Sequence, residues 1–246
     1  IYRGLGARLE WALLNYFIDE HIADGYEFIL PPYQLGYNCG LGAGQFPKFA
    51  DEVYWLDCDE DRKRNRFMLP TAETALVNMY SGEIVDESKL PMKFFAYSPC
   101  FRKEAGAAGR DTRGIVRVHQ FNKIEQYVFC KPEQSDEMHE HILNNLCEFM
   151  EAFELPYRII ANSTGDMGFN KVKMNDVEAW FPSENSYREL GSCSSIGQFQ
   201  ARRTNTRYRE NATGDVKYVA TLNNTAIALP RALVPIIENH QNPDGS

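Results

Sequence analysis

Two β-prone runs, residues 94–101 and 115–129, constrain the fold of this chain more than any other feature of its sequence. Between them lies a segment of small residues that also carries arginines, residues 105–114. A small, polar connection between two β-prone runs is typical of a β-hairpin, here one with a long tip. The chain is therefore expected to contain antiparallel β-structure around this hairpin.

The rest of the chain shows further strands, most of them linked by turns. Apolar spacing and turn residues predict helices at 5–22, 135–153 and about 228–240, and strands at 26–30, 157–161, 177–181, 187–191 and 217–222. Because the strands outnumber the helices and do not alternate with crossover helices, we expect an α+β fold in which helices flank an antiparallel β-sheet.

Two shorter segments complete this prediction. Thr71 is placed to cap a short helix that runs through residue 79. Residues 40–44 are glycine-rich, and Pro47 follows where a dinucleotide fingerprint would need a helix. We therefore expect a flexible loop at 40–44.

Composition excludes several classes of protein. The 246 residues, 43% of them hydrophobic, are ample to bury a core. The formal net charge of −8 argues against a domain that holds nucleic acid by its net charge alone. No run approaches the ~20 apolar residues of a membrane helix, and no signal peptide opens the chain. The six cysteines form no CxxC pair, which favours a reducing, cytoplasmic location.

One face of the hairpin carries chemically useful side chains. Residues of equal parity share a face of a strand, so Arg102 and Glu104 point the same way, as do Phe121, Lys123 and Glu125. A solvated sheet surface is an equally good interpretation of these residues alone. Arginine grips phosphate, a phenyl ring stacks on a base, and carboxylates hold Mg²⁺ or an ammonium group. The set would suit ATP bound beside an amino acid, although no Walker A motif is present.

Other polar clusters fit the same interpretation. Thr71 and Glu73 precede a helix, and Glu189 and Ser192 lie at a strand end where they could share a metal ion. Residues 223–225 form a polar group at a strand-to-helix junction, followed by Arg231. Each cluster alone is more typical of a cap, a turn or a surface charge than of a binding site.

Ten motifs spaced along the chain, taken together, resemble one family. They are YRGLGARLE (2–10), GQFPKF (44–49), PTAE (70–73), PCFRKEAG (99–106), RDTRG (110–114), HQFNKIE (119–125), TGDMGF (164–169), YRE (187–189), SCS (192–194) and FQARR (199–203). The chain is similar over essentially its whole length to the catalytic domain of bacterial-type seryl-tRNA synthetase, a class II aminoacyl-tRNA synthetase. The resemblance implies one class II catalytic domain over residues 1–246.

The resemblance also implies an activity and a site. The family activates L-serine with ATP to seryl-adenylate and transfers serine to tRNA(Ser). Arg102, Glu189 and Arg231 would be catalytic, with Glu189 and Ser192 holding Mg²⁺. The ATP-binding residues would be Arg102, Glu104, Val118, Phe121, Glu189, Ser192 and Arg231. The serine-binding residues would be Thr71, Glu73, Arg102, Glu125, Asn223 and Thr225.

The resemblance further implies partners. The first helix and the 31–32 strand resemble the motif that builds a homodimer in this family. The family's N-terminal coiled-coil arm, which grips tRNA, is absent from this chain, so most of the tRNA contact is expected there. Two alternatives remain open: a paralogue that adenylates serine or a similar amino acid for a non-tRNA acceptor, and a non-catalytic binding module.

The chain departs from the family in its third motif. Asn224, Ala226 and Pro230 stand where glycines are usual, and Gly191 stands where serine is more usual. Because glycine allows close approach of a ligand, the bulkier residues predict weaker ATP binding than in glycine-bearing relatives.

Overall fold

A seven-stranded sheet forms the centre of the computed structural model, which describes residues 1–57, 59–105 and 114–245. Six of the strands pair antiparallel, and β1 alone runs parallel to its neighbour β5. The expected α+β class with an antiparallel sheet is confirmed. In spatial order the strands are β1 (Glu27–Ile29), β5 (Met92–Phe101), β6 (Gln120–Cys130), β12 (Ala220–Leu229), β9 (Ser186–Gly197), β8 (Lys173–Phe181) and β7 (Tyr157–Ala161).

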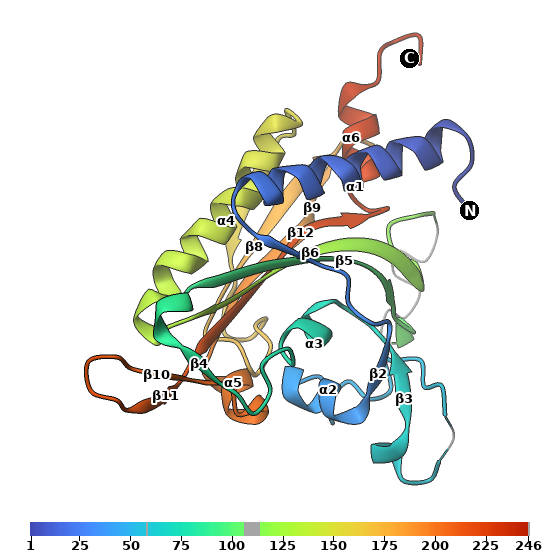
Figure 1. Cartoon of the computed structure of the whole chain (residues 1–246). Helices are drawn as coiled ribbons and strands as arrows, with labels where there is room; N and C mark the ends of the chain where they lie inside the picture. The colour runs from blue at the N-terminus through green and yellow to red at the C-terminus, as the bar shows by residue number, and fades with distance from the viewer. Residues whose placement is uncertain (58, 106–113, 246) are drawn as a thin grey trace.

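Two long helices, α1 (Leu5–Ala23) and α4 (Ser135–Ala152), cover one face of this sheet (Figure 1). In α4 the side chains of Ile142, Leu146 and Phe149 recur at helical spacing, and all three are buried in the main core. Phe17 of α1 packs on Phe149 with ring centroids 4.2 Å apart. Burying side chains of this size contributes about 1.5–3 kcal/mol each, so the packing of these helices on the sheet stabilises the fold.

Shorter elements gather on the opposite face and enclose a second core around Phe94 and Tyr127. They include a three-stranded sheet in the order β11–β10–β4 and a two-stranded sheet of β2 and β3. These elements are β2 (Gln34–Gly36), α2 (Tyr37–Ala43), β3 (Arg66–Met68), α3 (Glu73–Leu76), β4 (Ile84–Asp86), α5 (Phe199–Thr204), β10 (Arg207–Arg209) and β11 (Val216–Tyr218). The last helix, α6 (Leu233–His240), contacts β8.

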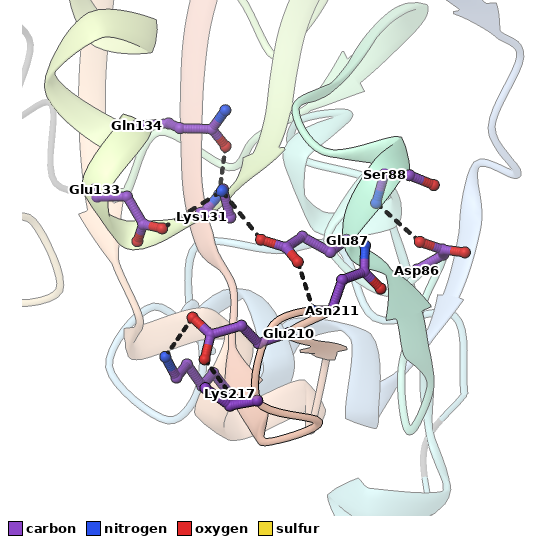
Figure 2. Close-up of polar contacts among 10 residues, drawn as sticks. Asp86, Glu87, Ser88, Lys131, Glu133, Gln134, Glu210, Asn211 and Lys217 are labelled. Atoms are coloured by element: carbon purple, nitrogen blue, oxygen red, sulfur yellow. Dashed lines mark hydrogen bonds and ion pairs between the residues drawn. The ribbon is translucent and has the colours of Figure 1, made fainter.

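A polar network joins the β10–β11 hairpin to the main sheet (Figure 2). Lys131, just after β6, pairs with Glu87 at 3.1 Å, and the other Glu87 oxygen accepts the backbone N–H of Asn211 at 2.6 Å. Within the hairpin, Lys217 pairs with Glu210 at 2.7 Å. These contacts are largely at the surface, where an ion pair contributes about 0–1 kcal/mol, so they orient the hairpin more than they stabilise the fold.

Most of the predicted elements are present. The hairpin runs over β5 and β6, and the helices predicted at 5–22 and 135–153 match α1 and α4 within one residue at each end. The strand predicted at 157–161 is β7. Of the predicted hairpin tip, residues 106–113 lie outside the described residues.

Three local predictions were wrong. Residues 40–43, expected in a flexible loop, belong to helix α2. A side chain at Gly40 would come within 2.4 Å of the Phe46 ring, which explains why glycine stands there. These glycines permit close packing rather than motion. The N-cap of α3 is Ala72, not Thr71, and α3 ends at Leu76. The Thr71 hydroxyl accepts a hydrogen bond from Lys123 instead.

The C-terminal boundary also differs from the prediction. β12 continues to Leu229, so residues 223–225 lie within a central strand, and α6 begins only at Leu233. Asparagine disfavours strands, but Asn224 is fully buried and donates to Gln126 Oε1 at 2.6 Å and to the Ile142 carbonyl at 2.8 Å. These partners compensate for its low strand propensity.

A β-bulge interrupts β12 where its pairing with β6 shifts between Thr225 and Ile227. Before the bulge, Thr225 faces the side away from α1 and α4, where its hydroxyl donates to Glu125. After it, Ile227 belongs to the core beneath those helices, whereas Ala228 lines the cavity on the opposite side. The bulge therefore shifts the alternation of β12 by one residue.

Candidate active site

Two neighbouring cavities open on the sheet face opposite α1 and α4, and Arg102 and Glu104 line both. The other residues around the first are Val116, Arg117, Val118, Phe121, Lys123, Glu189, Leu190, Thr225, Ala228, Leu229, Pro230 and Arg231. The other residues around the second are Ala43, Gly44, Gln45, Phe49, Glu52, Val53, Pro70, Thr71, Glu73, Asp166, Gly168, Asn170, Lys171 and Met174.

Arg102 lies between the cavities because it follows directly on β5. Its backbone N–H donates to the His119 carbonyl at 3.0 Å, which continues the hairpin by one pair. Its Nε donates to the Pro70 carbonyl at 3.0 Å, and its guanidinium lies 5.3 Å from the centroid of the Phe121 ring, within cation–π range. This leaves a planar cation held at the junction, beside an aromatic plate.

The Glu104 side chain points to the same side as that of Arg102, as predicted, since both side chains line both cavities. It adopts a left-handed backbone conformation with φ of 52° and pairs with Arg117 Nη1 at 2.6 Å. Sequence reasoning missed Arg117 as a site residue. Parity with Phe121 and Lys123 would have pointed to it had the predicted 115–129 strand formed in full, but β6 begins only at Gln120.

At the far side of the first cavity, Arg231 holds the strand that carries Glu189. Its Nη1 donates to the Glu189 carbonyl at 3.0 Å and lies 4.0 Å from the Glu189 carboxylate. Burial raises the pKa of Glu189, and Asp176 raises it further. The side chain is still 48% exposed, so it faces the open cavity rather than the core.

Glu189 and Ser192 lie within β9 rather than at its end. Ser192 is in register with Asp176 of β8, and both Ser192 Oγ and Asp176 Oδ1 are buried without a hydrogen-bond partner. A carboxylate beside such orphaned oxygens suits Mg²⁺, which commonly uses one or two carboxylates together with substrate phosphates. Among the described residues no cluster of three or more His, Cys, Asp or Glu could hold a metal ion by itself.

The second group of polar residues forms a buried chain across three elements. Lys123 Nζ donates to Thr71 Oγ1 at 2.7 Å and pairs with Glu125, whose Oε2 also accepts from the Thr225 hydroxyl at 3.4 Å. Lys123 is 4% exposed and Glu125 2%. Strand parity places Lys123 on this face, but no sequence motif predicted it as a site residue.

Glu73 lies beside this chain and lines the second cavity. Burial raises the pKa of its carboxyl group, and the nearby Glu125 raises it further. The fully buried Gln200 donates to Glu73 Oε1 at 2.7 Å, while its own Oε1 accepts from the Tyr127 and Thr221 hydroxyls. Gln200 therefore fixes the position of Glu73, a role that no local sequence pattern indicated.

Asn223 lines neither cavity. It lies two residues before Thr225 on the same face of β12, and its Oδ1 is buried without a hydrogen-bond partner. The structure thus brings most predicted residues around the two cavities, with Glu125, Ser192 and Asn223 behind the lining.

The departures from the third motif have different surroundings. Asn224 and Ala226 contact the helical side of the sheet, so among the three substituted positions only Pro230 lines the first cavity. At Gly191 a side chain would lie 2.6 Å from both Leu146 Cδ2 and the Thr225 carbonyl oxygen. Packing against α4 explains that glycine.

An antiparallel sheet with an arginine and a phenylalanine on its central hairpin, and a second arginine after a later strand, defines a class II aminoacyl-tRNA synthetase core. The chain belongs to this family, because residues 54–240 match the model of the tRNA synthetase class II core domain (G, H, P, S and T). Within the family its similarity is to seryl-tRNA synthetases, which confirms the resemblance predicted from the motifs.

Three relatives support this. Serine--tRNA ligase 2 of Clostridium acetobutylicum is 48% identical over all 246 residues, which cover 58% of that protein. Seryl-tRNA synthetase of Pyrococcus horikoshii, solved with ATP, is 42% identical with a TM-score of 0.89 over 96% of this chain and 52% of that one. The cytoplasmic enzyme of Naegleria fowleri, solved with AMP, is 35% identical with a TM-score of 0.91 over 99% of this chain and 56% of that one. The chain thus spans just over half the length of these relatives.

Proposed function

We propose that this chain is the catalytic core of a serine--tRNA ligase, acting as one domain over residues 1–246. It would activate L-serine with ATP to seryl-adenylate, releasing pyrophosphate, and then transfer serine to tRNA(Ser), releasing AMP. The observation that carries the proposal is the junction of two cavities at Arg102, one rich in cations beside an aromatic ring and the other lined by carboxylates. Relatives named serine--tRNA ligase and solved with ATP or AMP support it.

The first cavity would hold ATP. Phe121, with Val118 nearby, would stack on adenine, a contact that contributes about 1–3 kcal/mol per base in nucleic-acid binding. Arg102 would grip the α-phosphate, Arg231 the γ-phosphate, and Glu104 would meet groups on the adenine side. Mg²⁺ held by Glu189, Ser192 and phosphate oxygens would neutralise charge on the triphosphate. Bound this way, the α-phosphorus lies beside the second cavity.

Serine would lie where the two cavities meet, on Thr71 and Glu73 of the second cavity, Thr225 of the first, and Glu125 and Asn223 behind the lining. Its carboxylate would be gripped by Arg102, which places the attacking oxygen in line with the α-phosphorus. No covalent enzyme intermediate is needed, so positioning and charge neutralisation carry the reaction. A site that hydrogen-bonds the serine hydroxyl rejects alanine, because its buried polar groups would otherwise be left unpaired.

The molecule that receives the activated serine distinguishes this proposal from the paralogue. Nothing in the three relatives above favours a paralogue with a non-tRNA acceptor, since all three are named as tRNA ligases or synthetases. A non-catalytic module is disfavoured because both arginines and the carboxylates remain around the cavities.

The tRNA would be held mostly by an N-terminal arm outside this chain, and the location would be cytoplasmic. No helix in the described part of the chain is long and apolar enough to cross a membrane.

A homodimer is part of the same proposal. Leu5, Trp11 and Ile22 on α1 and Leu30 after β1 are large apolar side chains, each more than half exposed. Large apolar side chains exposed along neighbouring elements would suit a face that a second copy of the chain covers.

Serine-dependent exchange of pyrophosphate into ATP tests the activation step. We expect the wild-type chain to catalyse exchange with serine and Arg102→Ala to lose at least about 100-fold, the scale of removing a group that stabilises transition-state charge. Arg209→Ala, an exposed arginine on β10, is the matched control and keeps exchange near wild type. If no amino acid supports exchange, adenylation itself is refuted. Charging of tRNA(Ser) by the full-length protein then separates the ligase from the paralogue.

A further inference from the structure

The ammonium group of Lys123 occupies an unusual place for a lysine. It lies at the junction of the two cavities, because Lys123 lines the first while its hydrogen-bond acceptor, Thr71, lines the second. Its charge is matched by the buried Glu125 carboxylate, and the lysine itself is 4% exposed. Charged groups are almost never buried to this extent unless paired, so the Lys123–Glu125 contact accounts for the position of the ammonium.

The acceptors around this ammonium are those that the proposed serine site would use. An amino-acid ammonium carries one positive charge and three N–H donors, as does the lysine side chain. Glu125 and Thr71 offer the charge and the oxygens for one such group at hydrogen-bond distance. Two ammonium groups on the same acceptors would repel each other, so the Lys123 ammonium and a substrate ammonium compete.

We propose that Lys123 is a positioning residue. In the free protein its ammonium group contacts Glu125 and Thr71, and the ammonium group of the substrate displaces it from both when serine binds. The released side chain turns toward the first cavity, where it faces the phosphates of ATP. This inference rests on the proposed function, since it takes the substrate to be an α-amino acid bound beside ATP. The carboxylate of Glu125 is then paired throughout, which matters because an unpaired buried charge is strongly destabilising.

The exchange couples the two substrates. Serine binding moves a positive charge toward the triphosphate, and the triphosphate in turn draws Lys123 away from the serine acceptors. By linkage, each substrate must then raise the affinity for the other by the same factor. A coupling of roughly 5- to 150-fold, the usual range for such effects, is expected in the wild-type chain.

Calorimetry with Lys123→Met tests the exchange. Serine is titrated into wild-type and variant protein, each alone and with saturating α,β-methylene-ATP, which cannot be cleaved at the reacting bond. Methionine keeps the length of the side chain but has no ammonium to displace. We expect the variant to bind serine alone about tenfold more tightly than wild type, and the coupling to fall to about one.

Lys171→Met is the matched control. Lys171 lines the second cavity as another cation, but its Nζ contacts Met174 Sδ at 3.4 Å rather than Thr71 or Glu125. Lys171→Met therefore removes one positive charge from the cavity, but it does not remove a group that competes with serine for Thr71 and Glu125. Serine binding is therefore not expected to tighten in this variant, and the coupling with the ATP analogue is expected to persist.

Three other outcomes have distinct meanings. Weaker serine binding by Lys123→Met with the coupling intact would show that Lys123 is a fixed partner of Glu125, which overturns the inference and leaves the proposed function standing. No serine binding by the wild-type protein would refute the function instead. Should the variant not fold, the ¹⁵Nζ signal of Lys123 in wild type, assigned through its side-chain carbons, decides: it is expected to shift on adding serine, and an unchanged signal refutes the exchange.

Discussion

His21 shows how burial governs a single titratable residue. It is 1% exposed on α1, where Nδ1 lies 2.6 Å from the Phe17 carbonyl oxygen, and its ring packs near Phe95 and Phe149. Burial lowers the pKa of His21 to about 4, although the Phe17 carbonyl and Asp24 partly oppose the shift. The folded chain therefore keeps this ring neutral with Nδ1 as the donor.

Replacing His21 by Phe tests this effect. The folded pKa is lower than the unfolded one, so between pH 6.5 and about 4 the unfolded chain binds the proton and stability falls as the pH falls. One such group costs about 1.4 kcal/mol per pH unit over this window. Urea unfolding at several pH values measures the pH dependence of the free energy of unfolding. In His21→Phe this dependence is expected to be weaker than in the wild type by about 1.4 kcal/mol per pH unit between pH 6.5 and about 4. An identical slope in both proteins would contradict the assignment.

Predictability at the scale of residues depended on distance along the chain. Phe121 and Glu125 could be placed on one face from parity alone, because both lie on the same strand. The contact of Thr71 with Lys123 could not, since it joins residues 52 positions apart. Parity placed Arg102 beside Glu104, but the specific roles of Arg102 and Glu73 came only from the family resemblance.

Among the elements, β9 and α4 approach each other closely at a glycine, Gly191. Gly191→Ala would place a methyl group 2.6 Å from both Leu146 Cδ2 and the Thr225 carbonyl oxygen, in a region packed without room for it. Overpacking of this kind typically costs about 1–3 kcal/mol. Urea unfolding of the variant measures the cost.

Gly6→Ala provides the control within another element. Gly6 lies in α1 with open space around it, and alanine favours a helix over glycine by about 0.8–1.0 kcal/mol. We therefore expect opposite signs for the two substitutions. Stabilisation by Gly191→Ala would mean that α4 lies farther from β9 than described.

Element boundaries were predictable where local signals agreed with tertiary contacts. The apolar stripe of α4 marked it within one residue at each end. The end of β12 was not predictable, because the side chains of Asn223 and Asn224 suggest a turn while the neighbouring strands impose a sheet. The glycines of α2 were misleading for the same reason: they suggest flexibility, but Gly40 leaves room for the Phe46 ring and Gly42 for Asn78 and Thr204.

At the scale of the whole molecule, the turn-linked strands were enough to predict an antiparallel α+β sheet. The parallel pairing of β1 and the small β11–β10–β4 sheet were not predicted, because their strands are three residues long and carry too little pattern. Long elements thus define the class of fold, whereas the short ones that enclose the site depend on contacts between distant segments.

The proposed homodimer is the prediction that belongs to this scale. Trp11→Glu and Leu30→Glu each place a charge among the exposed apolar residues of α1 and β1, and are expected to shift the protein from dimer to monomer in sedimentation. Val216→Glu, on the β10–β11 hairpin, alters an exposed apolar residue outside this face and should leave the dimer intact. A monomeric wild type would refute the interface.

The bulge in β12 has a consequence for how such a site can change over time. Along β12, the side chain that faces the cavity is odd-numbered at Thr225 and even-numbered at Ala228. The bulge between them therefore reverses which residues of the strand face the cavity. Thr225 before the bulge and Ala228 after it both line the first cavity, because the bulge returns Ala228 to the face that Thr225 occupies. Deleting one residue at the bulge would therefore exchange the faces of Ile227 and Ala228, and would alter the first cavity and the core beneath α1 and α4 together.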